Sequence, residues 1–299
     1  MKKYNYKLLF LSLFLSIMIG CREEFNPNVD PTDTNLLVVE GFISTNGSMT
    51  EIKLSRTGNL NDGEFNIESG AIVELRGEES GFWQLTENVA GTYSMSANLP
   101  INQQYRLRIR LRNNDKYESD LMQPIVAPEI DDVNWRKSNS GVSIRVNTQG
   151  SEENQYFLWQ FEEDWLYRSA FGTSYVYLRD REVMVEATSE TNVSRCWNEN
   201  RVQRIAIENA ARFSENNILD KEITMIPNLS EKLGIRYSIL VKQISIDRAA
   251  FDFWEIMRKN TEDIGGIFSP LPSLIGGNIK MVGNEDIFAI GYISMGVTS

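Results

Sequence analysis

The sequence predicts a mostly β protein with two β-sandwich domains and one α-helix inserted near the C-terminus. Short segments of alternating apolar and polar residues recur along the chain, and turn-forming residues such as Asn46-Gly47 separate them. Apolar residues recur at helical spacing most clearly over residues 247–264. Many short strands without intervening helices are typical of packed sandwiches rather than of a helix-covered sheet.

Composition narrows the classes of function. The 299 residues are 41% hydrophobic and 24% charged, which are ordinary values for a folded globular chain. The formal net charge of −11 argues against nucleic acid as a partner. The chain has no histidine, which excludes catalytic triads, zinc motifs and nucleophile–base pairs that depend on histidine. We therefore expect no catalytic residue, no cofactor and no metal site.

The N-terminus carries the pattern of a bacterial lipoprotein precursor. Lysines precede an apolar run, Leu8–Ile19, that is too short to cross a bilayer core needing roughly 20 apolar residues. Residues 1–20 are therefore interpreted as a removed signal peptide. Gly20-Cys21 resembles the lipobox, which implies that Cys21 carries acyl chains (palmitate among them) and anchors the protein to a membrane. An ordinary signal peptide with a chance cysteine is the alternative.

The residues after Cys21 are expected to be a spacer. Residues 21–35 comprise the lipidated cysteine and a flexible linker, because prolines among Asp and Asn bury too little apolar surface to order the chain. Arg22-Glu23-Glu24 resembles the export signal that sends lipoproteins of Bacteroidota-type bacteria to the outer face of the outer membrane. The expected location is therefore the outer membrane, lipid-anchored, with the body facing the cell exterior; the periplasmic side is the alternative.

The N-terminal sandwich is predicted over residues 36–125. Its clearest strand, Tyr105–Arg112, places apolar side chains at every second position and four arginines on the other face. Such a face is usually solvated and opposed by acids, and we expect Glu118 and Asp120 on the next strand to take that role. An acidic partner gripped by the arginines is the alternative.

The C-terminal sandwich is predicted over residues 128–299, after a link stiffened by Pro124 and Pro128. The segment 235–244 reads as a central strand that leads directly into the helix 247–264, with Asp247 as its N-cap. The apolar stripe of this helix is expected to pack on its own domain; a groove for a partner is the alternative.

Two features of this second domain invite functional hypotheses. Glu162-Glu163-Asp164 suggests paired catalytic carboxylates, but neighbours on a strand point to opposite faces and cannot flank one bond. An aromatic cluster extends from Trp159 to Tyr177; most of it is expected in the core, and the part from Trp165 onward is the candidate contact surface. The possible partner-contact residues are Trp165, Tyr167, Phe171, Tyr175, Tyr177, Phe268, Leu271 and Leu274.

The second cysteine, Cys196, is expected to be a buried thiol. Cys21 is used by the lipid, so the chain offers Cys196 no intrachain disulfide. A reactive nucleophile would need a neighbouring base, and histidine is absent.

Taken together, these residues resemble known families. The strands from Val39 to Leu107 look like immunoglobulin-like regulatory domains found beside carboxypeptidases, and the Trp-bearing strand 156–161 resembles a fibronectin-type sandwich. The whole mature chain is similar to the Bacteroidota outer-membrane lipoproteins grouped as domain of unknown function 4249. The residues that carry this likeness are Cys21, Leu37–Gly41, Cys196-Trp197, Arg236–Ser238, Phe253-Trp254, Pro270–Pro272, Gly277–Ile279 and Gly291-Tyr292.

That resemblance implies a non-catalytic accessory subunit that helps a TonB-dependent outer-membrane transporter to capture a ligand, which the sequence does not name. Two alternatives stay open. One is a carboxylate-based glycoside hydrolase, which needs two acids roughly 5 to 9.5 Å apart in a cleft. The other is a structural or adhesive surface lipoprotein.

Overall fold

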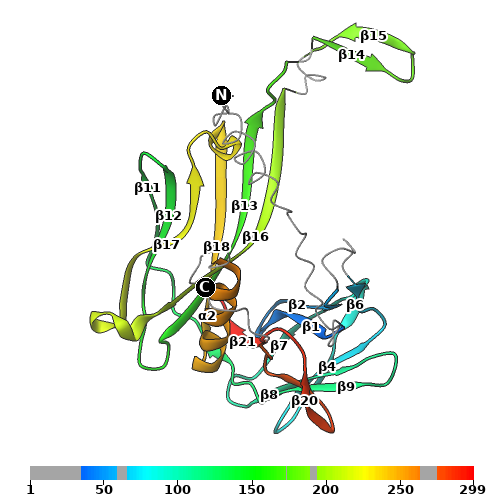
Figure 1. The fold of residues 1–299 in the computed structure, drawn as a ribbon, viewed down its shortest axis with the longest axis vertical. Coiled ribbons are helices and arrows are strands. Elements are labelled where there is room, and N and C mark those ends of the chain that lie inside the picture. The colour runs from blue at the N-terminus through cyan, green and yellow to red at the C-terminus, as the bar shows by residue number, and fades with distance from the viewer. Residues whose placement is uncertain (1–34, 59–65, 173, 189–193, 263–274) are drawn as a thin grey trace, which may run out of the picture. The chain divides into compact units, whose positions relative to one another are not determined.

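The computed structural model describes residues 35–58, 66–172, 174–188, 194–262 and 275–299. Within these residues the chain forms five β-sheets, one α-helix and short 3-10 turns (Figure 1). Cys21, the signal segment and the linker lie outside the described residues. The prediction of a mostly β protein with one helix near the C-terminus is confirmed.

Sheets A and B form the first sandwich. The order in sheet A is β10 (Ile125–Val126), β21 (Ser294–Val297), β1 (Leu37–Ser44), β2 (Asn46–Arg56), β7 (Thr92–Asn98) and β6 (Thr86–Val89), with β3 (Asn66–Ile67) paired to β2. The order in sheet B is β20 (Asn284–Phe288), β19 (Ile279–Met281), β9 (Lys116–Ser119), β8 (Tyr105–Arg110), β4 (Ile72–Gly77) and β5 (Phe82–Gln84). One contiguous buried cluster fills the space between these sheets.

Strand β8 shows why this sandwich closes. Tyr105, Leu107 and Ile109 are buried at every second position, as the alternating sequence predicts. On the other face, Arg108 lies opposite Glu118 of β9, and its Nε is 2.9 Å from a Glu118 carboxylate oxygen. Arg106 lies 3.8 Å from the same carboxylate. Glu118 therefore takes its predicted role for Arg106 and Arg108, whereas Arg110 lies opposite Lys116 and Asp120 comes after the end of β9.

The last strands of the chain return to the first sandwich. Strand β19 pairs with β9 in sheet B, and β21 pairs in parallel with both β1 and β10 in sheet A. The buried Asn278 side chain secures this return, because it donates to the Ile293 carbonyl (2.8 Å) and accepts from the Ile293 amide (3.0 Å). Gly291 allows the close approach to β1, since a Cβ there would lie 1.9 Å from the Val39 carbonyl oxygen.

This return differs from the predicted organisation. The sequence places all residues after 128 in a second domain, whereas residues 279–297 supply strands and buried side chains to the first. The link between Pro124 and Pro128 also contains a strand, since Ile125 and Val126 extend sheet A. The division at residues 125–128 remains a prediction, with this correction for the last strands. Such pairing joins distant segments, so no local pattern encodes it.

Sheets C and D form the second sandwich. Sheet C is ordered β11 (Asp132–Lys137), β12 (Gly141–Gln149), β17 (Asn217–Pro227), and sheet D is ordered β16 (Arg195–Asn209), β13 (Tyr156–Arg168), β18 (Arg236–Ile246). Their shared core includes Phe157, Trp159 and Phe161 from one face of β13. Short 3-10 turns, η1 (Ala210–Arg212), η2 (Ser214–Asn216) and η3 (Glu231–Leu233), connect these strands. Strand β16 is 15 residues long and pairs with β13.

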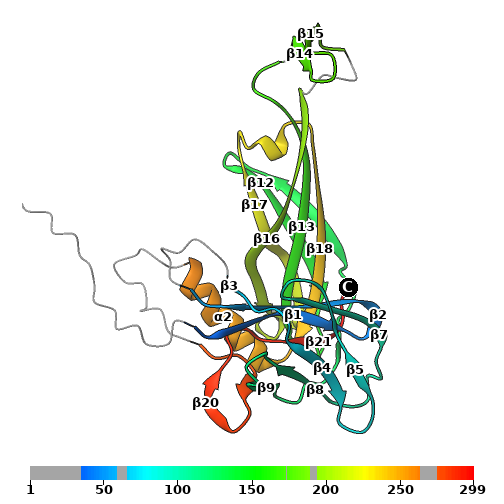
Figure 2. The same cartoon turned by 90° about the vertical axis from the view of Figure 1, so that its right-hand side faces the viewer.

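Helix α2 (Arg248–Glu262) packs against the other face of sheet D, at the end where β13 begins (Figure 2). Its N-cap is confirmed, because the Asp247 carboxylate accepts from the Ala250 amide at 2.7 Å. Ala250 is buried against Leu158 and Ile244 of the sheet, as the predicted apolar stripe requires. Phe42 of β1 also packs against this cluster, and the ring of Phe253 on the helix lies 5.7 Å from that of Tyr292, shortly before β21.

Candidate functional site: an apolar hairpin arm

Beyond the second sandwich, the chain forms a separate hairpin. After Arg168 of β13 the strands β14 (Tyr175–Leu178) and β15 (Val183–Glu186) pair only with each other, among the described residues. Both views place this pair at the far end of β13 and β16 (Figures 1 and 2). We call β14, β15 and the described residues 169–172 that lead to them the hairpin arm.

The hairpin arm exposes apolar side chains on both faces. The register puts Tyr177 opposite Met184 on one face. On the other face Val176 and Val185 are half-buried, and Val183 is 44% exposed. Phe171, Tyr175, Tyr177 and Met184 are 87%, 56%, 54% and 63% exposed, respectively. An isolated two-stranded hairpin is marginally stable in water, and clustered exposed apolar residues usually mark an interaction site. The hairpin arm therefore has the properties of a surface that a partner completes.

The base of the arm is held by a buried polar cluster. Glu163 of β13 is 1% exposed and accepts hydrogen bonds from the Lys232 ammonium (2.5 Å) and the Tyr237 hydroxyl (2.6 Å). Burial, together with this hydrogen bond to a carboxylate, raises the pKa of Tyr237 well above its ordinary value. Trp165 donates its indole N–H to Glu231 at 3.1 Å, and the Lys232 ammonium lies 4.9 Å from the ring centre. These contacts tie η3 to β13 and β18 where the strands approach the arm.

The structure divides the predicted contact residues into three groups. Phe171, Tyr175 and Tyr177 are exposed on the hairpin arm, and Tyr167 is half-buried at its base. Trp165 is not part of a contact surface, because only 6% of it is exposed and it shares the inner face of β13 with Phe161. Phe268, Leu271 and Leu274 lie outside the described residues.

Trp197 is an exposed aromatic residue that the contact prediction missed. It lies on β16 opposite Leu166, is 70% exposed, and lines a cavity of about 220 Å³ with Asn198 and Arg236. The pair Cys196-Trp197 was the available signal, since alternation places the two side chains on opposite faces of a strand. Cys196 is half-buried rather than buried, because it lies opposite Tyr167 near the end of β13.

The adjacent carboxylates are separated as the strand geometry predicts. Glu163 points into the sandwich, whereas Glu162 on the outer face lies 2.7 Å from the Lys242 ammonium. Glu162 also lines a cavity of about 300 Å³, whose other acidic residues are Glu40 and Glu51 of sheet A. Phe42 and Trp254 provide the aromatic wall of this cavity.

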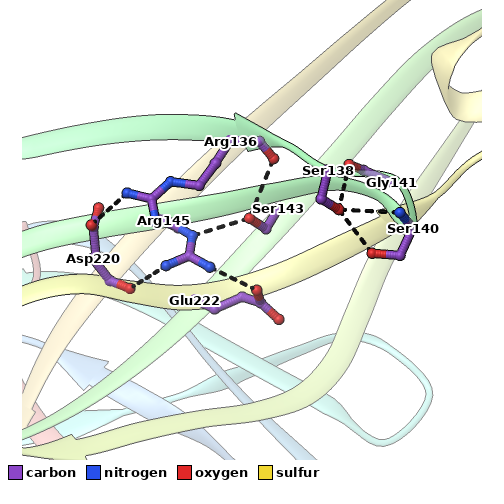
Figure 3. Close-up of polar contacts among 8 residues, drawn as sticks. All are labelled: Arg136, Ser138, Ser140, Gly141, Ser143, Arg145, Asp220 and Glu222. Atoms are coloured by element: carbon purple, nitrogen blue, oxygen red, sulfur yellow. Dashed lines mark hydrogen bonds and ion pairs between the residues drawn. The ribbon is translucent and has the colours of Figure 1, made fainter.

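The outer face of sheet C pairs its own charges. Arg136 of β11 contacts Asp220 of β17 at 2.7 Å, and Arg145 of β12 contacts Glu222 of β17 at 3.4 Å (Figure 3). Arg145 also donates to Ser143 Oγ at 3.0 Å. Because these charges are balanced across the three strands, this face has the character of a solvated surface.

The part of the chain that the structure describes contains no group of three or more Cys, Asp or Glu side chains arranged to hold a metal ion. It also contains no helix with the length and apolar character needed to span a membrane.

The fold and site define a mostly β, sandwich-built protein that presents an apolar hairpin arm. Residues 22–299 match the model of the family described as domain of unknown function (DUF4249), and the chain belongs to that family. No match was found among curated proteins. Among solved structures, the chain is similar to the FN1–FN3 domains of chicken CNTN1, at 13% identity and a TM-score of 0.22, over 72% of this chain and 63% of that one.

Proposed function

We propose that this protein is a non-catalytic lipoprotein of the outer membrane, anchored through Cys21, that serves as an accessory subunit of a TonB-dependent transporter. The observation that carries the proposal is the hairpin arm, whose apolar side chains are exposed on both faces. The lipobox-like Gly20-Cys21 and the Arg22-Glu23-Glu24 signal support the location.

The size of the arm fits a protein–protein contact. A Phe or Tyr side chain buries roughly 150–250 Å² when fully covered. With the exposed fractions of Phe171, Tyr175 and Tyr177, a partner would remove about 400 Å² from water. At about 25 cal/mol per Å², this is ~10 kcal/mol of gross stabilisation. Association costs ~4–15 kcal/mol, so these three residues can carry an interface to which Met184 and Trp197 add.

The cluster beneath the arm supports the same function. An interface gains affinity when its residues are positioned before binding, because less conformational entropy is lost. The hydrogen bonds of Glu163 with Lys232 and Tyr237 join β13, from which the arm extends, to its neighbours η3 and β18. The arm is thus a small apolar element on a rigid base.

The test is affinity capture of the full-length protein from detergent-solubilised outer membranes. The expected result is co-purification of a β-barrel transporter with the wild type and its loss with the double variant Tyr175→Ser/Tyr177→Ser. Phe82→Ser is the matched control, since Phe82 is a 53% exposed aromatic on β5 of the other sandwich. A barrel retained by the double variant, or missing from the wild type, would overturn the proposal. Intact mass of the mature protein tests the anchor, which requires acyl chains on Cys21.

A glycoside hydrolase is the second candidate, favoured by the carboxylates of Glu40, Glu51 and Glu162 around the 300 Å³ cavity. Its test is release of reducing sugar from a panel of surface polysaccharides, compared between the wild type and Glu51→Gln. Turnover by the wild type that the variant lacks would replace the accessory role with an enzymatic one.

A further inference from the structure

Sheet D has an open edge along β18. The sheet is ordered β16-β13-β18, and β18 pairs with β13 along its whole length. On the other side of β18, the described residues provide one main-chain partner, Ser299. The Gln243 amide donates to the Ser299 carbonyl at 2.8 Å, and the Ser299 amide donates to the Gln243 carbonyl at 3.0 Å.

The contact with Ser299 shows which main-chain groups face the open side. In an antiparallel ladder, the residues of one strand direct their N–H and C=O groups alternately to its two sides. Because those of Gln243 point away from β13, those of Val241 and Ile239 do so as well. These N–H and C=O groups can therefore form hydrogen bonds with an additional strand, which would continue the ladder that begins with the Ser299–Gln243 pair.

Sheet C leaves apolar side chains uncovered on the side that faces sheet D. Val133 and Trp135 of β11 lie directly opposite Val146 and Ile144 of β12, so all four point to the same face. Val146 and Ile144 are buried, yet Val133 is 45% and Trp135 is 68% exposed. Strand β11 therefore extends past the strands of sheet D that could cover it.

The open edge and the uncovered side chains lie on the same side of the sandwich. The Ile130 amide, two residues before β11, donates to Ser299 Oγ at 3.2 Å. Ile130 also packs against the same core as Ile239 and Val241. One strand position beside β18 would thus satisfy the edge and cover the inner face of β11.

We propose that this position binds an extended segment of a partner protein, which pairs antiparallel with β18 from Lys242 to Arg236. Adding a strand to an exposed edge is a common mode of peptide recognition, in which main-chain bonds give affinity and alternate side chains give specificity. The inward positions of the segment face Val241, Ile239 and the uncovered Trp135, so they require apolar, β-branched residues. The outward positions face Lys242 and Arg236, so they require acidic residues.

Charge argues against a second copy of this chain as the occupant. If two β18 strands paired antiparallel about Ile239, Arg236 of one copy would lie opposite Lys242 of the other. Like charges directly opposite one another destabilise a strand pair. An acidic, alternating segment satisfies the same edge without that repulsion.

The experiment uses the mature protein and a labelled, end-blocked peptide, Glu-Val-Thr-Val-Thr-Val-Glu. Its scrambled control is Val-Val-Val-Glu-Thr-Glu-Thr. Fluorescence anisotropy is expected to show saturable binding of the first peptide, at least about tenfold tighter than the second. Amide hydrogen exchange is expected to slow at Val241 and Ile239 on binding.

Two variants locate the binding. Val241→Pro removes a backbone amide that points to the open edge of sheet D, and the fold should tolerate it because proline fits an edge strand. The variant should therefore bind the peptide at least about tenfold more weakly. Leu240→Thr keeps every amide and should bind as the wild type does. Should Val241→Pro fail to fold, Trp135→Ser tests the covered face without altering β18. The proposal is overturned by no difference between the peptides, by protection confined to other strands, or by a concentration-dependent dimer that protects the β18 amides.

Discussion

The ion pair beneath the hairpin arm gives the sharpest prediction on stability. Lys232→Met keeps a side chain of similar length over Trp165. It removes the ammonium group from the Glu163 carboxylate, which is 1% exposed and keeps the hydrogen bond from the Tyr237 hydroxyl. Breaking a buried pair by removing one partner costs about 3–5 kcal/mol, because a buried charge is left uncompensated. Loss of the cation–π contact adds ~0.5–1 kcal/mol.

A double-variant cycle separates the pair from simple packing. Replacing both groups, as Lys232→Met/Glu163→Gln, removes the buried charge together with its partner. The free energy of unfolding of this double variant should lie within ~1 kcal/mol of the wild-type value, since replacing a buried ion pair by uncharged residues often changes stability little. The coupling free energy between the two positions should therefore be about 2 kcal/mol or more.

The assay is urea unfolding followed by circular dichroism and tryptophan fluorescence. For a chain of this size the denaturant slope is ~3 kcal/mol per M, so Lys232→Met should lower the midpoint by roughly 1 M. The double variant should restore most of that shift. A single variant within ~0.5 kcal/mol of the wild type, or a double variant no better than the single, would refute the view that this pair holds the base of the arm.

Three further predictions concern the rest of the fold. Gly291→Ala should lower the free energy of unfolding by more than about 2 kcal/mol, because the backbone is at φ +115° and the new Cβ would meet the Val39 carbonyl. Calorimetry would detect the lower stability. Gly283→Ala is the control for backbone strain alone, because Gly283 also has a positive φ but has open space around it. Asp247→Ala should lower the free energy of unfolding by ~1 kcal/mol, because it removes the N-cap of α2. Thermal unfolding measures this loss, and Asp247→Asn, which can still cap the helix, should retain most of the stability. Hydrogen bonds from the Gly91 and Gly70 amides lower the folded pKa of Glu87, so its stabilisation is present above the unfolded pKa near 4.5 and is lost as pH falls through the lower folded value. Glu87→Gln should thus cost ~1 kcal/mol at pH 7, after allowance for solvent screening, and less at pH 3; an equal cost at both pH values would contradict this sign.

Local patterns predicted the elements whose stability is local. The alternation at Tyr105–Arg110 gave a strand with its buried face, and Asp247 gave the start of α2. Trp165 was misplaced although the same alternation places it with Phe161 on the inner face of β13. The segment from Trp165 onward was predicted to be a contact surface, but β13 continues three residues past Trp165 to Arg168.

Features that depend on distant segments were not predictable in this way. Strand β16 is rich in polar residues and exists because β13 pairs with it along its length. The return of β19 and β21 to the first sandwich depends on Asn278 and Gly291, which carry no strand signal of their own. For the site, the aromatic residues Phe171, Tyr175 and Tyr177 were predicted to be exposed, and they lie exposed on the hairpin arm, but the hairpin itself was not predicted. The exposure of Trp197 depends on the register between β13 and β16.

The central claim, that the hairpin arm contacts a membrane partner, is tested most directly in living cells. A photo-crosslinking phenylalanine analogue replaces Tyr177, and a second strain carries it in place of Phe82 as the matched control. Irradiation is expected to yield an adduct between position 177 and a β-barrel transporter of the outer membrane, and none from position 82. No barrel adduct from position 177, or equal adducts from both positions, would contradict the account.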